Sequence, residues 1–342
     1  MAVRKERESL FLKPIGLVEL AKIAGLAPST ISRALSDSPR VSKETKERIR
    51  SLAAEHGFRL NQTASALRKR RTGAIGVVFP LGHEIDQSLS DPFFMGLLGP
   101  LADALAKQGY DVLLSRVIPD NEAWLDDIIA SGRVDGIVLV GQSNQTEIIE
   151  RAARAFTPMV VWGAMRENAV QITVGTDNRA GGAMATRHLI GIGRRRLAFL
   201  GDPAVPEFAD RHAGFLDAIK AANGVEESVL PLHLTDQDAY DEMARFLADH
   251  PAPDGVLAAS DVIAMSAMRA ITDQGLRVPQ DVSVVGYDDI GIAAHTAPPL
   301  TTIRQDTRKG AQLLVDLLLR RIGGEEVRSV MMDPELILRG SA

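Results

Sequence analysis

Cysteine is absent from this sequence of 342 residues, which excludes disulfide bonds and thiolate metal sites and fits a reducing compartment. Long hydrophobic runs are absent too, because no apolar stretch approaches the roughly 18 residues that span a bilayer. The basic residues Arg4, Lys5 and Arg7 precede an apolar stretch at only 10–12, which is too short for the core of a signal peptide. These absences together predict a cytoplasmic protein without a membrane segment.

Sequence signatures of catalysis and of tightly bound cofactors are missing as well. The sequence has no Gly-x-Gly-x-x-Gly after its first core strand, no Walker-type Gly-Lys-Ser/Thr and no Gly-x-Ser-x-Gly elbow. Its seven histidines are scattered, with no pair at metal-ligand spacing. An enzyme is therefore disfavoured, and we expect neither a cofactor nor a metal ion.

Charge is unevenly distributed along the chain. Residues 1–72 contain 16 Lys and Arg against 7 Asp and Glu, a net charge of +9. Residues 73–342 contain 23 against 37, a net charge of −14, so the overall charge of −5 conceals a basic head on an acidic body. Binding to a phosphate backbone favours this asymmetry, because Lys and Arg displace condensed counterions. The length and the hydrophobic content of 45% predict two or three globular domains.

The basic head has the pattern of a helix-turn-helix. Apolar residues recur at helical spacing through 17–24 and again through 31–35. Gly25 separates the two runs, where a tight turn needs an unhindered backbone. Two short helices joined in this way can place the second one in the DNA major groove. An ordinary αα-hairpin would show the same spacing, but the coincident positive charge favours DNA binding.

Two further helices are expected before the core. One spans about 43–56, with Ser42 as its N-cap and Gly57 as its C-terminal stop. The other is short, begins at Asn61 and ends in four consecutive basic residues at 68–71.

From Gly73 onward, short apolar strands alternate with amphipathic helices, which is typical of parallel sheets covered on both faces. The predicted strands are 74–79, 112–114, 136–140, 159–162, 197–200, 256–259 and 282–287. The predicted helices are 94–108, 121–131, 146–156, 179–190, 209–222, 238–249, 261–274 and 306–322. These units are too many for one lobe, so we expect an all-α head followed by an α/β core of two doubly wound parallel-sheet lobes. A small molecule would bind between the lobes, beyond the carboxyl ends of their strands.

Five motifs resemble the lactose-repressor (LacI/GalR) family of bacterial transcription regulators. They are VELAKIAG at 18–25, STISR at 29–33, VSKETKERI at 41–49, GYDD at 286–289 and PLTTI at 299–303. The resemblance covers nearly the whole chain from about residue 15. It implies a repressor that binds palindromic double-stranded operator DNA and is controlled by a small effector. It also implies a homo-oligomer, and because no leucine-heptad tail follows the last strand we expect a homodimer.

The resemblance further implies a division of the chain into three parts. The helix-turn-helix domain would span 15–60 and the hinge helix with its linker 61–72. The effector-binding and dimerisation core at 73–342 would be periplasmic-binding-protein-like. Its first lobe would take about 73–174 and 304–328, and its second lobe about 175–300 and 329–342.

Family positions that contact base edges lie at the start of the second helix, where this chain has Pro28, Ser29 and Arg33. Arg33 can donate a bidentate pair to guanine, with a phosphate contact as the alternative. Ala27 stands at the N-cap, where the family usually has a hydroxyl residue. The candidates for phosphate contacts are Thr30, Ser32, Arg40, Ser42 and Thr45.

The segment 61–69 resembles the family's hinge helix, in which Asn61, Ala64 and Arg68 are candidate DNA contacts. Leu67 matches the leucine that wedges between central base pairs from the minor groove. Packing of Leu67 against its dimer mate is the alternative role, and the two can coexist. Because a helix this short is marginal in isolation, we expect it to fold on the operator.

The candidate effector-binding residues come from the resemblance and are Asp91, Phe93, Phe94, Gln142, Trp162, Asp177, Glu207, Arg211 and Asp288. Arg211 and Asp288 are expected on opposite lobes, where each could make two directional hydrogen bonds to a ligand. Core packing is the alternative for Phe94 and Trp162. Helix N-capping is the alternative for Asp177 and the role that we expect for Asp261.

Several acceptors, an arginine and aromatic surfaces favour a carbohydrate effector. A purine or another metabolite is the runner-up, because the same residue types can sandwich and hydrogen-bond a nucleobase. A solute-binding protein of the cytoplasm would share the two-lobed cleft but would bind no operator. Whether the effector releases or promotes DNA binding stays open.

Overall fold

The computed structural model describes residues 15–58, 71–82, 87–233 and 235–342. The chain divides into two compact units, a head up to Thr72 and a core that begins at Gly73. The head is described here by itself and so is the core. Most of the predicted hinge segment at 61–72 lies outside the described residues.

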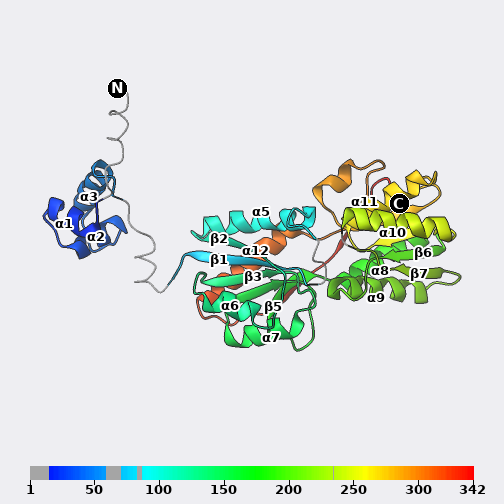
Figure 1. The fold of residues 1–342 in the computed structure, drawn as a ribbon, viewed down its shortest axis with the longest axis horizontal. Helices are drawn as coiled ribbons and strands as arrows, with labels where there is room; N and C mark the ends of the chain where they lie inside the picture. The colour runs from blue at the N-terminus through cyan, green and yellow to red at the C-terminus, as the bar shows by residue number, and fades with distance from the viewer. Residues whose placement is uncertain (1–14, 59–70, 83–86, 234) are drawn as a thin grey trace, which may run out of the picture. The chain divides into compact units, whose positions relative to one another are not determined.

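Within residues 15–58, the head contains three helices: α1 (Leu17–Ala24), α2 (Pro28–Leu35) and α3 (Lys43–Glu55) (Figure 1). The apolar spacing read from the sequence becomes a small core, in which α1 contributes Leu20, α2 contributes Ile31 and α3 contributes Ile49, all without solvent exposure. Gly25 ends α1 with a φ of 69°, a left-handed conformation that glycine adopts without steric cost. The expected helix-turn-helix is therefore present.

Side chains cap the third helix but not the second. Ser42 accepts a hydrogen bond from the backbone N–H of Thr45 at 3.3 Å, as the sequence predicted. Ala27 occupies the N-cap of α2 and offers no side-chain acceptor. The first-turn N–H groups of α2 therefore have no side-chain cap at that position.

The first lobe of the core contains a six-stranded parallel sheet with the order β11-β5-β4-β3-β1-β2. Its strands are β1 (Ala74–Pro80), β2 (Asp111–Val117), β3 (Gly136–Val140), β4 (Met159–Trp162), β5 (Ile172–Thr176) and β11 (Val330–Met332). The helices α5 (Pro92–Lys107) and α12 (Thr307–Ile322) cover one face. The helices α6 (Trp124–Ala130) and α7 (Thr146–Ala155) cover the other face (Figure 1).

The second lobe contains a six-stranded sheet with the order β12-β10-β9-β8-β6-β7. Its strands are β6 (Arg196–Leu200), β7 (Glu226–Leu230), β8 (Gly255–Ala258), β9 (Ser283–Asp288), β10 (Thr301–Arg304) and β12 (Glu335–Ile337). All pairs are parallel except that β12 runs antiparallel to β10. The paired helices α8 (Asn178–Gly191) and α9 (Pro206–Lys220) lie on one face (Figure 1). The paired helices α10 (Asp236–Asp249) and α11 (Asp261–Asp273) lie on the other, and the 3-10 helix η1 (Gly291–His295) follows β9.

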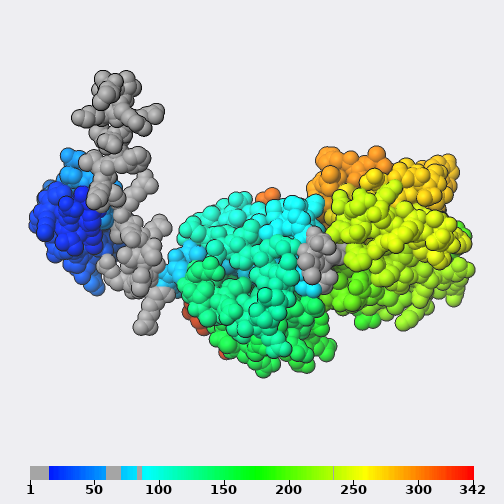
Figure 2. All heavy atoms as spheres, viewed as in Figure 1, coloured from blue at the N-terminus to red at the C-terminus, as the bar shows by residue number. Residues whose placement is uncertain are grey.

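The two doubly wound lobes confirm the predicted fold class. All seven predicted strands and all eight predicted core helices are present, with ends shifted by at most three residues. Five short strands were missed: β5, β7, β10, β11 and β12. Figure 2 shows the outer surface of the core, with the first lobe in cyan and green and the second in yellow-green to orange.

The expected lobe boundaries need two corrections. The first lobe extends to Thr176, because β5 belongs to its sheet. The segment 330–332 also belongs to the first lobe, because β11 pairs with β5 through Val330 and Val174. The described chain therefore passes between the lobes three times: after β5, after β10 and after β11. A strand of three residues carries too little pattern to be read from the sequence.

Across the described residues, none of the helices combines the length and the apolarity needed to cross a membrane.

Candidate functional site

A cavity opens where the carboxyl ends of strands from both lobes meet. Pro80 at the end of β1, Trp162 at the end of β4 and Asp288 at the end of β9 all line it. It holds about 790 Å³ of space free of protein atoms, including the part open to solvent. In doubly wound α/β folds, sites for small molecules typically lie at such strand ends.

Seven of the nine predicted effector-binding residues lie on the wall of this cavity: Asp91, Phe93, Phe94, Trp162, Glu207, Arg211 and Asp288. The other two do not line it. Asp177 caps α8, because its Oδ1 accepts the backbone N–H of Ala180 at 2.8 Å. Gln142 is buried and donates from Nε2 to the carbonyl oxygen of Ala164 at 2.9 Å.

Five polar residues on the wall were not singled out in the sequence: Gln87, Ser143, Asn178, Ser260 and Gln305. Ser260 carries a signal that was available, since it directly follows the predicted strand at 256–259, whereas Asn178 and Gln305 follow β5 and β10, which the sequence did not predict. Ser260 also caps α11 by accepting the N–H of Ile263 at 3.2 Å. A capping role and a place on the wall therefore occur in one side chain.

Arg211 is almost fully buried in α9 and is held by contacts on several sides. Its Nε donates to Oδ1 of Asn178 at 2.9 Å, and its Nη1 donates to the carbonyl oxygen of Ala259. Its guanidinium lies 3.8 Å from the centre of the Tyr287 ring and Nη1 is 3.8 Å from Oδ1 of Asp288. The planar group is thus fixed before any ligand arrives.

The expectation that Arg211 and Asp288 lie on opposite lobes is wrong. α9 and β9 both belong to the second lobe, whose sheet brings the two side chains together. The first lobe instead supplies Asp91, Phe93, Phe94 and Trp162. The sequence could not show this, because side-by-side placement of the two residues depends on strand order in the sheet.

Asp288 is a buried carboxyl group with two polar neighbours. Gln305 donates from Nε2 to its Oδ1 at 2.7 Å, and Arg211 attracts it. Burial nevertheless raises the pKa of Asp288 to about 7, with a smaller contribution from the negative charge of Asp91. The side chain can therefore accept from a ligand when ionised and donate to one when protonated.

Asp261 differs from its expected role as an N-cap. Ser260 is the cap of α11, and Asp261 is the first residue inside that helix. Its carboxyl group interacts with the hydroxyl of Thr302 at 2.6 Å and accepts the backbone N–H of Ile290 at 2.9 Å. Burial and the nearby Asp288 raise the pKa of Asp261 well above its ordinary value. Two adjacent buried carboxyl groups thus support the end of β9.

Aromatic side chains form the wall that the first lobe contributes. The rings of Phe93 and Trp162 have centroids 6.0 Å apart, and Phe94 packs edge-on against Phe79 at 4.9 Å. A Cβ on Gly310 would lie 2.2 Å from the indole of Trp162, so only glycine lets α12 approach this ring. Trp162 therefore both packs against α12 and faces the cavity.

Two further carboxyl groups reach the cavity from helix starts. Asp91 caps α5 by accepting the N–H of Phe93 at 2.9 Å and also accepts from Nε2 of Gln87 at 3.0 Å. Glu207 lies in the first turn of α9, and burial raises its pKa. The cavity thus combines three carboxyl groups with one arginine.

The head presents the start of α2 to solvent. Pro28, Ser29 and Arg33 are exposed, while Ile31 and Ala34 face the small core. Ser29 and Arg33 are four residues apart and therefore share one face of α2. This is the part of a helix-turn-helix that can reach base edges.

Positive side chains of the head fall into two groups. Lys46 and Arg50 both pair with Asp37, at 3.0 and 3.1 Å, and Arg48 donates to the carbonyl oxygen of Ala24 at 2.8 Å. Within residues 15–58, the side chains of Arg33 and Arg40 make no ion pair or hydrogen bond. These two arginines are available to an external partner.

The other predicted phosphate contacts are more varied. Ser42 and Thr45 contact each other through their hydroxyl groups at 2.8 Å in the cap of α3. Thr30 and Ser32 are half-buried. Asn61, Ala64, Leu67 and Arg68, the predicted hinge contacts, lie outside the described residues.

Among the residues that the structure describes, no group of three or more His, Asp or Glu side chains is arranged to hold a metal ion.

A head with a helix-turn-helix and a two-lobed core with a cavity define a class of ligand-binding regulators. Residues 17–61 match the model of bacterial regulatory proteins of the lacI family, and residues 186–342 match that of a periplasmic binding protein-like domain. The chain belongs to the LacI family of bacterial transcription regulators, which bind DNA.

Two curated relatives illustrate this membership. The transcriptional repressor PurR of Haemophilus influenzae is 30% identical over 336 residues, which cover 94% of this chain and 97% of the relative. The transcriptional regulator CelR of Thermobifida fusca is 32% identical over 333 residues, which cover 94% of this chain and 96% of the relative.

Solved structures show the same likeness. A complex of the regulator CelR with cellobiose has a TM-score of 0.70 at 30% identity and covers 96% of this chain and 100% of that one. The lac repressor dimer bound to operator and the anti-inducer ONPF has a TM-score of 0.83 at 25% identity and covers 96% and 99%.

Proposed function

We propose that this protein is a cytoplasmic transcriptional repressor whose affinity for operator DNA is controlled by a small effector bound between the core lobes. One observation carries the proposal. Two separate lobes place aromatic rings, three carboxyl groups and a fixed arginine around one cavity, in a chain whose helix-turn-helix exposes Arg33 without a partner within residues 15–58. Binding of a ligand that favours one arrangement of the lobes would shift the DNA affinity by the same coupling free energy.

A carbohydrate is the effector that the cavity chemistry favours. Asp91, Glu207 and Asp288 offer several acceptors for hydroxyl groups, and Trp162 with Phe93 offers apolar faces. The CelR structure with bound cellobiose supports this class. A purine is the second candidate, because relatives named PurR match over most of the chain and Asp288 can accept from a ring N–H.

On the DNA side, we infer that Ser29 and Arg33 contact base edges and that Arg40 contacts phosphate. Pro28 would contact base edges beside them at the start of the helix, and Thr30, Ser32, Ser42 and Thr45 would contact phosphates. A homodimer would present two such heads to a palindromic operator.

Leu67 would wedge into the minor groove, so Leu67→Ala should weaken operator binding and reduce DNA bending. Unchanged bending would refute the wedge.

A thermal-shift screen of the full-length protein against monosaccharides, disaccharides including cellobiose, purines and sugar acids tests the effector class. Because a ligand of the native state stabilises by RT ln(1 + [L]/Kd), an effector at 100 Kd adds about 2.7 kcal/mol. Asp288→Asn should abolish the shift. A shift that persists unchanged in Asp288→Asn would place the effector elsewhere.

DNA binding separates the regulator from a solute-binding protein that only shares the two-lobed core. Titration with genomic fragments at increasing salt should show a steep fall in affinity, because phosphate contacts release counterions. A protein that retains no fragment even in dilute buffer would be no regulator.

A further inference from the structure

Two successive residues at the end of β9 have backbone conformations that residues with side chains rarely adopt. Asp288 has a φ of 120° and Asp289 a φ of 55°. Such conformations are strained for residues other than glycine and persist only where the surroundings fix them. Asp288 lines the cavity and directly precedes Asp289, so whatever fixes Asp289 also bears on the position of a wall residue.

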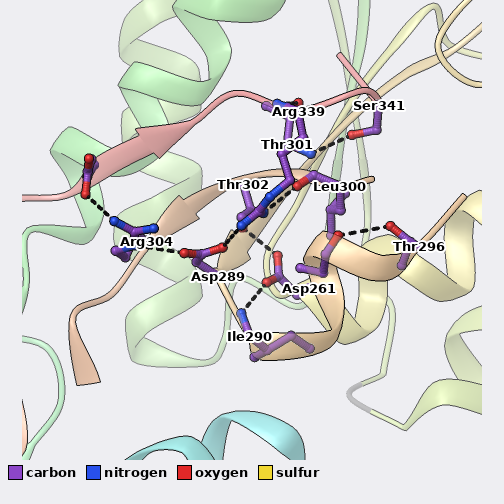
Figure 3. Close-up of polar contacts among 12 residues, drawn as sticks. Asp261, Asp289, Ile290, Thr296, Leu300, Thr301, Thr302, Arg304, Arg339 and Ser341 are labelled. Carbon is purple, nitrogen blue, oxygen red and sulfur yellow. Dashed lines mark hydrogen bonds and ion pairs between the residues drawn. The ribbon is translucent and has the colours of Figure 1, made fainter. Parts of the chain in front are cut away.

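A pair of arginines fixes Asp289. Arg304, at the end of β10, donates from Nε to Oδ2 of Asp289 at 2.7 Å, and Arg339 donates from Nη2 to Oδ1 (Figure 3). The carboxyl group of Asp289 is 9% exposed. Each oxygen of this carboxylate therefore binds its own guanidinium, and charge-assisted bonds of this kind are the strong ones.

Arg339 is itself held from several directions. Its backbone N–H donates to Oγ1 of Thr301 at 2.9 Å, and its Nη1 donates to the carbonyl oxygen of Leu300 at 2.7 Å. Two residues further on, Ser341 accepts the N–H of Thr301 at 2.8 Å (Figure 3). It also donates to the carbonyl oxygen of Val284 at 2.6 Å. The segment 339–341 is thus hydrogen-bonded both to β9, through Val284, and to β10, through Thr301.

We propose that Arg339 is a positioning residue for the effector site, which holds Asp289 in its left-handed conformation so that the neighbouring carboxyl group of Asp288 faces the cavity. Arg339 does not line the cavity itself. This role rests on the proposed function, in which Asp288 contacts the effector. Arg304 also contacts Asp289, but it is less committed to this contact than Arg339. Its side chain is 41% exposed and also pairs with Glu335, whereas the side chain of Arg339 is 17% exposed.

The first test uses the ligand-free full-length protein, so its outcome is independent of effector and operator. Arg339→Met keeps the apolar stem and removes the guanidinium, and Arg339→Lys restores a charge. Arg194→Met is the matched control, because Arg194 ties the other end of β9 through Ser283 at 3.0 Å and Gln280 at 3.3 Å.

Two readouts follow the end of β9. Hydrogen exchange of peptides covering 286–292 should accelerate about tenfold in Arg339→Met and stay unchanged in Arg194→Met. Carboxyl-carbon NMR, with Asp288 assigned through Asp288→Asn, should show a pKa of Asp288 that differs from its wild-type value in Arg339→Met, because both the hydration of Asp288 and the charge beside it change. Arg339→Lys should fall between wild type and Arg339→Met. Wild-type exchange and titration in Arg339→Met would overturn the proposal.

A second pair of variants tests whether the backbone conformation is what matters. Asp289→Ala and Asp289→Gly both remove the carboxylate, but only glycine adopts a φ of 55° without strain. Asp289→Gly should therefore keep the titration of Asp288 closer to wild type than Asp289→Ala does. Equal or larger loss in Asp289→Gly would show that the charge of Asp289, and not its conformation, positions Asp288, and would overturn the proposal as stated.

Discussion

The head and the core cavity hold their charged side chains in opposite ways. In the head, Arg33 and Arg40 are exposed and have no partner within residues 15–58. In the cavity, Arg211 already contacts Asn178 and Asp288 and stacks on an aromatic ring. The head is thus ready for a partner that brings opposite charge, whereas a ligand of the cavity must share or replace existing contacts.

This difference predicts two kinds of sensitivity. Exposed arginines facing a polyanion make binding dependent on salt, because counterions compete for the phosphates. Buried carboxyl groups with raised pKa values make the core dependent on pH, because each burial cost vanishes when the group takes up a proton. Salt should therefore act mainly through the head and pH mainly through the core.

The largest effect is expected in the core, where Asp288→Asn should change how stability depends on pH. Burial raises the pKa of Asp288 from 3.8 to about 7, so between these values the folded protein keeps a proton that the unfolded chain loses. The stability contributed by the protonated form is present below the lower value and is lost as pH rises to the upper one. Asp288→Asn should therefore be more stable than wild type by about 2–4 kcal/mol at about pH 8 and equally stable near pH 3.5.

Urea unfolding at several pH values checks this prediction, with Asp281→Asn as the control. Arg277 holds the pKa of the exposed Asp281 down to about 2, so that variant should not gain stability at alkaline pH. Equal stability of Asp288→Asn and wild type across the range would mean that Asp288 is ionised at no cost.

In the head, the largest effect is expected for Arg33, one of the two arginines without a partner within residues 15–58. Arg33→Ala should weaken operator binding by about 1–3 kcal/mol and relax the sequence preference at one base pair, because a bidentate contact to a base is lost. Fluorescence anisotropy with a selected operator and single-base variants measures both effects. Arg50→Ala is the matched control, since Arg50 is already paired with Asp37 at 3.1 Å. Equal losses in the two variants would remove Arg33 from the base-reading role.

A third, smaller effect distinguishes phosphate contacts from base contacts. Arg40→Ala should weaken binding to all sequences alike and reduce the slope of log affinity against log salt by about 1. The same anisotropy titrations at four salt concentrations give the slope. A sequence-dependent loss would assign Arg40 to base reading.

The smallest effect concerns the missing cap of α2. Ala27→Ser supplies the side-chain acceptor that this helix lacks and should stabilise α2 by about 1 kcal/mol. Slower hydrogen exchange of the amides at 28–31 in the full-length protein measures this gain. Ala27→Gly is the control, because it provides no side chain; equal protection in both variants would exclude capping as the cause.

Much of the fold could be predicted because long periodic segments carry their own signal. The buried strand β3 was placed at its true ends, and the cap of α3 at Ser42 was identified from one residue type. Edge strands were harder. β7 begins with exposed Glu226 and Glu227, so its composition does not indicate a strand.

Seven of the nine residues predicted for the effector site line the cavity, but the lobe that supplies each one was not predicted correctly. The family resemblance led to Arg211 and Asp288, yet strand order decides that both lie on one lobe. Gln305 was missed because it lies on a crossing between lobes, where neither helix nor strand periodicity applies. The contact of Arg339 with Asp289 joins residues 50 positions apart, so no local sequence pattern predicts it.

The central claim is that occupancy of the cavity changes how the head binds DNA. The most direct measurement is the Kd of full-length protein for one selected operator, with and without a ligand that raises its melting temperature. The account predicts a change of at least about tenfold, which Asp288→Asn abolishes. A ligand that saturates the cavity and leaves the Kd for the operator unchanged would contradict it.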